Sequence, residues 1–393
     1  MTRHSYAGNT AIVGIGATEF SKNSGRSELQ LAIEACTAAC EDAGLPTSRV
    51  DGLVTYTMET NPENEIMRGL GIEELRHFSR IHFGGGAPCG TVELAAMAVN
   101  EGVADYVLCY RAFNERSGRR FGSGVHDRPA GLTAEEAQFA WTSPYGLLTP
   151  ASWVAMFATR IMHEYGVTSE DFGLVAVADR KHAATNPKAH FYGQPITLED
   201  HQASRWIVEP LHLLDCCQET DGGQALLVTT LERARDLPGA TAVINGAAQA
   251  IAGEQQMMRS YGRESLVGLP EMGICARQLW ESSGLGPDDI QTAVIYDHFT
   301  PFVLPQLEEF GFCKRGEAKD FMANGAIEIG GRLPINTHGG QLGEAYLHGM
   351  NGIAEGVRQI RGTSVNQVDS VSNVLVTGGT GVPTSALLLG QEG

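Results

Sequence analysis

The chain carries the stretch CTAACEDAGLPTSRVDGLVTY at residues 36–56 and a similar stretch, ARQLWESSGLGPDDIQTAVIY, at residues 276–296. The two align without a gap, and the alignment pairs Gly44 with Gly284. Each has the pattern of a helix that ends at a glycine, followed by an apolar run that is typical of a strand. The sequence therefore predicts the same helix–strand unit once in each half of the chain.

A second pair of segments repeats in the same order. The Gly-Gly pair at 85–86 falls on the Gly-Gly pair at 339–340, and VNEGV at 99–103 falls on IAEGV at 353–357. Chance could produce either overlay alone, but two overlays in one order indicate a duplicated chain. Glycine clusters of this kind also permit a ligand to lie against the main chain.

The duplication predicts an α/β fold of two similar halves of βαβαβ type, with layered helices and sheets. We expect the halves at residues 1–235 and 240–393. The first is enlarged by an inserted loop domain at 111–212, with helical patterns at 153–165 and 172–185. Such inserted segments often cover a site and shape its substrate pocket.

Composition excludes several classes of function. Lys and Arg number 28 against 46 Asp and Glu, and this net charge of −18 argues against a nucleic-acid partner. No apolar run approaches the roughly 20 residues of a membrane span, and the strand pattern at 10–16 begins without a basic and apolar leader. The 8 cysteines form no CxxC pair, so reduced thiols are expected. We expect a cytoplasmic protein that binds neither nucleic acid nor membrane.

Several segments carry a resemblance to a known family: AIVGIGATEF near the start, SRWIVEPLHLLDCCQETDGGQALLV, YDHFTP, HGGQLGEAYLHGMNG, and VLVTGGTG near the end. In order and spacing they resemble the thiolase superfamily, in its lipid-transfer-protein-like branch related to sterol carrier protein thiolases. The resemblance spans essentially the whole chain. It implies a duplicated thiolase-like fold.

Other residue types stand at the positions of the thiolase catalytic groups. Gly85 falls where the family has its nucleophilic cysteine, and Leu375 falls where it has its second cysteine. Tyr346 stands at the position of the catalytic histidine. Tyr296 stands at the position of the asparagine in the family's Asn-Glu-x-Phe segment, a position at which the sterol carrier branch tends to have histidine. A chain without these thiols and this imidazole should not perform thiolase chemistry.

Two tyrosines suit a reaction with an enolate intermediate and no acyl-enzyme. The resemblance implies that these positions converge on the thioester oxygen, so Tyr296 and Tyr346 are expected to face one pocket. One well-placed donor to an oxyanion is worth about 3–4 kcal/mol in the transition state. A phenol that acts as a base at neutral pH needs its pKa lowered from about 10 to roughly 7.

Retro-aldol cleavage of a β-hydroxyacyl-CoA is the reaction that fits. The resemblance implies an aldolase, a carbon–carbon lyase, of bacterial steroid side-chain degradation in cholesterol catabolism. It would convert a 17-hydroxy acyl-CoA into a 17-ketosteroid and propionyl-CoA. The resemblance also implies a homodimer, or a heterotetramer with an OB-fold, acyl-CoA-associated partner that itself contains zinc. No cofactor and no metal in this chain are expected besides the CoA of the substrate.

The predicted catalytic residues are Tyr296 and Tyr346, with backbone N–H groups at Gly85, Gly86 and Gly379 as oxyanion donors. The secondary candidates are titratable side chains beside these motifs, namely Asp297, His298, His338 and His348. A lone histidine is usually a satisfied structural residue, and no spacing among these residues forms a metal set.

Alternatives stay open on the sequence alone. The chain could be a catalytically inactive acyl-CoA or sterol carrier, or an acyltransferase that uses Cys89, one turn into a helix. An isolated cysteine is more often a small buried apolar residue, and the Cys216–Cys217 pair is expected to pack. The insertion also holds a basic group that is either a phosphate-binding site or a solvated loop, made of Arg116, Arg119 and Arg120.

Overall fold

The computed structural model describes residues 4–82, 84–118, 120, 137, 139–379 and 384–392. Among them, one nine-stranded mixed sheet has the order β3-β2-β4-β7-β1-β8-β11-β10-β9. Its strands are β1 (Thr10–Ala17), β2 (Gly52–Tyr56), β3 (His77–Ile81), β4 (Val107–Asn114), β7 (Asp221–Thr230), β8 (Ala242–Ala250), β9 (Thr292–Val294), β10 (Asn373–Gly378) and β11 (Thr384–Gly390). A small second sheet pairs β5 (Trp206–Val208) with β6 (Leu211–His212).

Helices lie on both faces of the sheet and in the insertion. The described α-helices are α1 (Glu28–Asp42), α2 (Glu63–Leu70), α3 (Pro88–Asn100), α5 (Pro150–Tyr165), α6 (Ser169–Thr185), α7 (Leu198–Ala203), α8 (Leu231–Ala234), α9 (Pro270–Ser283), α10 (Val303–Glu309), α11 (Ala318–Met322), α12 (Gly340–Gly343) and α13 (Met350–Arg361). In the described part of the chain, none of them has both the length and the apolar character needed to cross a bilayer.

The duplication is visible in the strand order. From the centre outward, one side of the sheet has β1, β7, β4 and β2, and the other has β8, β11, β10 and β9. β2 is parallel to β4, as β9 is to β10, and the inner pairs are antiparallel. The first sequence overlay placed β2 on β9 in this same correspondence. The α/β fold with a repeated strand order is confirmed, and the domain boundaries stay predictions.

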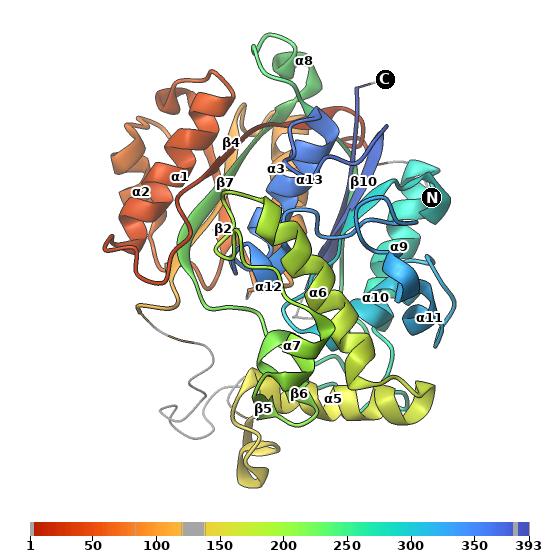
Figure 1. The fold of residues 1–393 in the computed structure, drawn as a ribbon. Helices are drawn as coiled ribbons and strands as arrows, with labels where there is room; N and C mark the ends of the chain where they lie inside the picture. The colour runs from red at the N-terminus through yellow and green to blue at the C-terminus, as the bar shows by residue number, and fades with distance from the viewer. Residues whose placement is uncertain are drawn as a thin grey trace.

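The helices form layers with the two halves of the sheet (Figure 1). In Figure 1, α1 and α2 lie on the left, α3 and α13 in the middle, and α9 and α10 on the right. One buried apolar cluster joins α3 and α13 to strands of both halves, through Val92, Ile353, Val54, Ile244 and Val376. A second buried apolar cluster joins α1 to the strands of the first half of the sheet. A third joins α9 and α10 to the strands of the second half.

The register of the second overlay is wrong. α3 ends at Asn100, whereas α13 continues beyond residue 357 to Arg361. Both helices are followed by a glycine in the left-handed region, Gly102 at φ 69° and Gly362 at φ 70°. These glycines are equivalent C-terminal caps, because only glycine adopts this conformation without a Cβ penalty. The match of Glu-Gly-Val at 101–103 with Glu-Gly-Val at 355–357 aligned the end of one helix with the interior of the other.

Two helices of the insertion begin before their predicted positions. α5 begins at Pro150, where the Thr149 side chain accepts a hydrogen bond from the N–H of Ser152. α6 begins at Ser169, after Thr168, which caps it in the same way. In Figure 1 the helices α5 and α7 of the insertion lie in the lower part of the molecule, and α6 rises from there toward α12. The insertion therefore adjoins the end of the sheet at which the glycine-rich turns lie.

Candidate active site

A cavity of about 930 Å³ lies between the insertion and the glycine-rich turns of both halves. Pockets of roughly 300–1,000 Å³ are typical of small-molecule sites. Gly84, Gly85 and Gly86 form part of its wall beside Tyr296 and Tyr346. Its apolar lining comes largely from the insertion and the segments after it, and includes Leu147, Phe139, Trp153, Ile207, Val208 and Met258.

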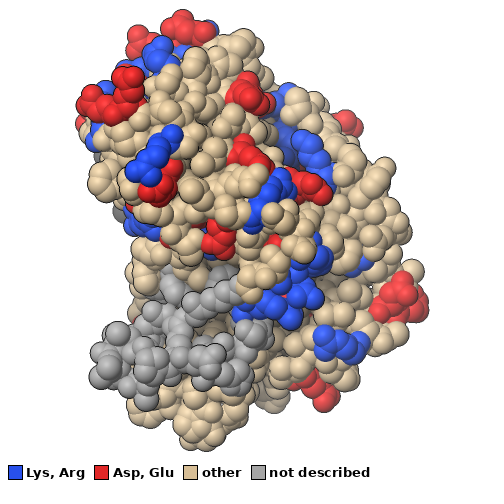
Figure 2. Space-filling model, turned by 90° about the vertical axis from the view of Figure 1, so that its left-hand side faces the viewer, with Lys and Arg blue, Asp and Glu red and all other residues tan. Residues whose placement is uncertain are grey.

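The rim of this cavity is basic. Lys22, Arg116, Arg120 and Arg205 line the cavity and are exposed to solvent. Arg120 pairs with Glu219 at 2.6 Å. Figure 2 shows Lys and Arg side chains gathered at mid-height on one face of the molecule, although the chain as a whole carries a net charge of −18. Of the predicted basic group, Arg116 and Arg120 therefore lie at the cavity, and Arg119 lies outside the described residues.

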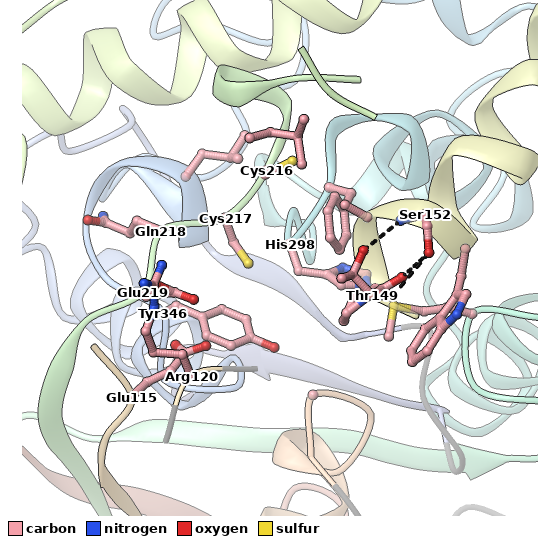
Figure 3. A pocket seen from close by; sticks show the side chains of 18 of the residues that line it. Glu115, Arg120, Thr149, Ser152, Cys216, Cys217, Gln218, Glu219, His298 and Tyr346 are labelled. Carbon is pink, nitrogen blue, oxygen red and sulfur yellow. Dashed lines mark hydrogen bonds and ion pairs between the residues drawn. The ribbon is translucent and has the colours of Figure 1, made fainter. Parts of the chain in front are cut away.

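Tyr296 and Tyr346 come together in the cavity. Tyr296 follows β9, and Tyr346 lies between α12 and α13. The phenol of Tyr296 donates a hydrogen bond to that of Tyr346 at 3.4 Å between the oxygens. Figure 3 shows the Tyr346 ring pointing into the cavity toward its centre. The structure thus brings the pair to one compartment, and their catalytic role stays a prediction.

The ring of Tyr296 lies in a socket of glycines. A Cβ on Gly85 would overlap the phenolic oxygen and lie 2.6 Å from Cζ of Tyr296. A Cβ on Gly379 would lie 2.6 Å from Cε1, and one on Gly349 would lie 2.9 Å from Cε2. Real Cβ atoms do not approach this closely, so the socket requires glycine on these sides of the ring. Tyr296 occupies the space that a nucleophilic side chain at Gly85 would need.

Both phenols are neutral at neutral pH. Burial raises the pKa of Tyr296 well above 10, and its interaction with Tyr346, through the hydrogen bond and through any negative charge on that phenol, raises it further. Burial also raises the pKa of Tyr346, as do Cys217 and Glu115 nearby. The hydrogen bond from Tyr296 and the cation of Arg111 act in the opposite direction on the Tyr346 pKa. The surroundings therefore act in both directions on the pKa of Tyr346, whereas those of Tyr296 all raise its pKa.

His348 lines the cavity, and a hydrogen bond from Arg111 fixes the orientation of its ring. Its Nδ1 accepts a hydrogen bond from Nε of Arg111 at 3.1 Å, and its ring lies 5.0 Å from that of Tyr346. Burial and the Arg111 cation lower the pKa of His348 well below 6.5, so the ring is neutral and carries its proton on Nε2. Its φ of 51° is a strained value for a residue with a Cβ.

Arg111 and Glu59 form a buried ion pair that supports His348. The guanidinium lies 2.9 Å from the carboxylate, and both side chains are buried. Sequence reasoning missed these residues. The available signal was a charged residue in the apolar run that forms β4, where an unpaired charge would be costly.

His298 lines the cavity on the other side of Cys217, as Figure 3 shows. Its ring stacks on Phe302 with 5.2 Å between the ring centroids. Burial lowers the pKa of His298 to about 3, so it is a neutral imidazole. Cys217 points into the cavity beside Tyr346, and burial raises the pKa of its thiol well above 9. Glu115, also buried, lines the cavity near Tyr346. The sequence did not single out Cys217 or Glu115 as cavity residues.

Two predicted candidates lie behind the cavity wall. The carboxylate of Asp297 accepts backbone hydrogen bonds from Gln341 and Leu342 and does not line the cavity. His338 is buried, with Nε2 3.9 Å from the carboxylate of Glu344, and does not line the cavity either. The structure therefore brings His298 and His348 to the tyrosine pair, but not Asp297 or His338.

The predicted oxyanion donor at Gly379 is engaged within the fold, and a role for the backbone near it stays a prediction. The N–H of Gly379 donates to the carbonyl oxygen of Gly85 at 2.6 Å. A donor that is already engaged in a short backbone hydrogen bond is not available to a substrate oxygen. Gly85 and Gly86 do line the cavity, and their role as donors stays a prediction.

The acyltransferase alternative with Cys89 is contradicted. α3 begins at Pro88, so Cys89 lies in the first turn and not one turn into the helix. The thiol is buried and donates to the carbonyl of Val376 at 3.6 Å. Burial raises its pKa far above 9, and it does not line the cavity. A protonated thiol that the substrate cannot reach is not a nucleophile.

Among the described residues, no group of three or more His, Cys, Asp or Glu side chains could hold a metal ion. The prediction that the chain needs no cofactor stays a prediction. What the cavity offers chemically is a pair of phenols in contact, flanked by neutral imidazoles and glycine-rich backbone.

Comparison with known proteins identifies the scaffold. The model of the thiolase C-terminal domain-like family matches residues 253–391. The solved structure of human mitochondrial 3-ketoacyl-CoA thiolase superimposes with a TM-score of 0.66 at 14% identity, covering 98% of this chain and 99% of that one. At this identity the likeness shows the fold alone, and it confirms the thiolase-like fold.

Other relatives are far more similar. The chain is 68% identical over 385 residues to a steroid side-chain-cleaving aldolase of Thermomonospora curvata, covering 98% of each. It is 65% identical to the 17-hydroxy-3-oxo-4-pregnene-20-carboxyl-CoA lyase of Mycobacterium tuberculosis, covering 98% of this chain and 100% of that protein. The solved structure of an Ltp2-ChsH2(DUF35) aldolase superimposes with a TM-score of 0.94 at 67% identity, covering 98% and 99% of the two chains. The chain therefore belongs to the thiolase-like family of steroid side-chain-cleaving aldolases.

Proposed function

We propose that this enzyme cleaves the side chain of a 17-hydroxy steroid acyl-CoA by a retro-aldol reaction, giving a 17-ketosteroid and propionyl-CoA. Relatives at 65% and 68% identity carry the names of a lyase and an aldolase of this class. The observation that carries the proposal is the contact of Tyr296 with Tyr346 in the cavity, at the place where a thiolase needs its nucleophile. Phenols cannot form the acyl-thioester enzyme, but they can move a proton.

The reaction moves one proton from the substrate hydroxyl to the α-carbon of the acyl-CoA. Since burial raises both pKa values, a free phenolate is costly, and a relay avoids it. As the hydroxyl gives its proton to Tyr296, Tyr296 passes its own proton to Tyr346 along the hydrogen bond that it already donates, and Tyr346 protonates the enolate carbon. The bond between C17 and the α-carbon breaks, the electron pair moves onto the thioester as enolate, and each phenol ends with one proton.

Tyr346 takes the carbon side in this proposal, because it is the acceptor in the hydrogen bond between the two phenols. The hydrogen bond from Tyr296 and the Arg111 cation both act to lower the pKa of Tyr346, which suits the phenol that gives its proton to the enolate carbon. The neutral His348, with its proton on Nε2, is a donor that could meet the thioester oxygen where the enolate charge develops. A neutral donor serves this purpose without changing the net charge of the cavity.

The cavity fits the two ends of such a substrate. Its apolar lining from the insertion suits a steroid ring system. The exposed basic side chains at the rim, Arg116 and Arg120 among them, suit the phosphates of CoA. We propose this orientation, with the rings in the insertion and the CoA at the rim.

A partner protein also belongs to the proposal. The similar aldolase of known structure, Ltp2-ChsH2(DUF35), has a DUF35 component in its name. We propose that this chain works with an OB-fold partner of that kind, which carries its own zinc, and that the chain itself forms homodimers within a heterotetramer.

Incubation of the co-purified complex with 17-hydroxy-3-oxo-4-pregnene-20-carboxyl-CoA tests the function. We expect equal amounts of a ketosteroid and propionyl-CoA, detected by mass spectrometry, without added free CoA. A need for free CoA would instead indicate thiolysis. An inactive carrier would bind the thioester and release neither product.

A further inference from the structure

Asp297 connects the two segments that carry the tyrosines. It follows Tyr296 directly, and its Oδ1 accepts the N–H of Gln341 at 2.9 Å. Its Oδ2 accepts the N–H of Leu342 at 3.1 Å. Both donors belong to α12, the single helical turn that precedes Tyr346. One buried carboxylate therefore ties the end of β9 to the segment that positions the second phenol.

The fit around this carboxylate is tight. Gly340 adopts φ 63°, and a Cβ there would overlap Oδ2 and lie 2.7 Å from Cγ of Asp297. Only glycine permits the backbone of α12 to approach a side chain this closely. Asp297 itself is 1% exposed. A buried carboxylate with both oxygens engaged holds its partners at a defined separation.

A second buried aspartate comes from the insertion. Asp179 of α6 faces Asp297, and burial together with the Asp297 charge raises the pKa of Asp179 well above 3.8. Burial raises the pKa of Asp297 as well, but the N–H groups of Gln341 and Leu342 lower it, so Asp179 is the member that favours the protonated form, in which it is a donor toward Asp297. Nδ2 of Asn336 lies 3.5 Å from Oδ2 of Asp179. α6 also contacts α12 directly, since Gly343 packs on Ala183.

We propose that Asp297 is a positioning residue that sets the separation of the two phenols, and that Asp179 holds it in place from the insertion. The inference rests on the proposed function of the tyrosine pair. Asp297 touches neither the cavity nor the substrate, so it acts through the backbone of α12. The insertion thereby controls the geometry of the site as well as covering it.

Matched isosteric variants test the proposal in the intact complex. In Asp297→Asn only one side-chain oxygen remains as an acceptor. The NH₂ group of the amide then faces the N–H of Gln341 or Leu342, and because two donors cannot form a hydrogen bond with each other, α12 shifts. We expect kcat to fall at least tenfold and the KM for the acyl-CoA to change less than threefold, because the cavity lining is retained. Asp179→Asn keeps a donor toward Asp297, so its kcat should stay within threefold of the wild type. A kcat near that of the wild type in Asp297→Asn would overturn the proposal.

A double variant separates positioning from a structural role. If Asp297 acts through the phenols, adding Asp297→Asn to Tyr346→Phe should lower kcat less than threefold further. A full tenfold loss in that background would contradict the proposal. If Tyr346→Phe alone kept full activity, the proposed function would fail instead, so the two failures are distinguishable.

A third comparison does not depend on Asp297→Asn folding. Asp179→Ala removes the donor to Asp297, and we expect its kcat to fall at least threefold below that of Asp179→Asn. Equal kcat values for these two variants would contradict the role of Asp179. Melting temperatures of all variants, compared with that of the wild type, show whether the folded enzyme was assayed.

Discussion

A single methyl group at Gly85 should disable the site. The Cβ of Gly85→Ala would overlap the phenolic oxygen of Tyr296 and lie 2.6 Å from its Cζ, so the ring must move. It has little room, because Gly349 and Gly379 lie against other sides of the ring. Overpacking of this kind costs about 1–3 kcal/mol of stability. Displacement of a reacting group by about 1 Å can cost roughly 100-fold in rate.

Steady-state cleavage of the acyl-CoA by the purified complex measures this effect. We expect kcat of Gly85→Ala to fall by about 100-fold. Gly253→Ala is the matched control, because a Cβ at Gly253 meets no atom within 4 Å. A kcat of Gly85→Ala within threefold of both the wild type and the control would refute the reasoning that the glycine socket positions Tyr296.

Further predictions concern groups around the phenols. Tyr346→Phe should lower kcat at least 100-fold through loss of one proton-transfer group, with ligand affinity, measured by calorimetry, unchanged. Arg111→Met leaves the buried Glu59 carboxylate unpaired, and chemical denaturation should show a loss of about 3–5 kcal/mol. Because the folded-state pKa of Asp179 is raised, its stabilising contribution is present at low pH and is lost as pH rises through that pKa. The melting temperature of Asp179→Asn should therefore exceed that of the wild type at pH 8 by more than at pH 5, and the opposite trend would contradict the assignment. Arg116→Ala should raise the KM for the acyl-CoA and leave kcat unchanged, and an unchanged KM at low salt would contradict a phosphate-binding rim.

The fold was predictable because the two halves of the chain contain similar segments that align directly. The gap-free overlay of residues 36–56 on 276–296 identified the correspondence of β2 with β9 without any tertiary information. The second overlay failed in register because short Gly-containing matches occur both at helix ends and inside helices. The start of α5 was also misplaced, although the sequence carries its signal, a threonine N-cap at Thr149 followed by proline at the first helical position.

The tyrosine pair was predictable by aligning the chain with the motifs of the thiolase family. Many of the side-chain and backbone contacts around the pair were not predictable in this way. Arg111 and His348 are far apart in the sequence, and only the folded sheet brings them to hydrogen-bond distance. The hydrogen bond of the Gly379 N–H with Gly85 is a backbone contact that side-chain identities do not encode. Asp297 was identified as a titratable candidate, but its orientation away from the cavity depends on the packing of α12.

The central claim is that two phenols in contact form one proton-transfer unit that replaces the thiolase nucleophile. The most direct measurement is kcat for Tyr296→Phe, Tyr346→Phe and the double variant in the same complex. If the pair acts as a unit, the kcat of each single variant falls at least 100-fold below that of the wild type. The kcat of the double variant is then only slightly lower than that of either single variant. Losses that multiply in the double variant, or a single variant that retains activity, would contradict the claim.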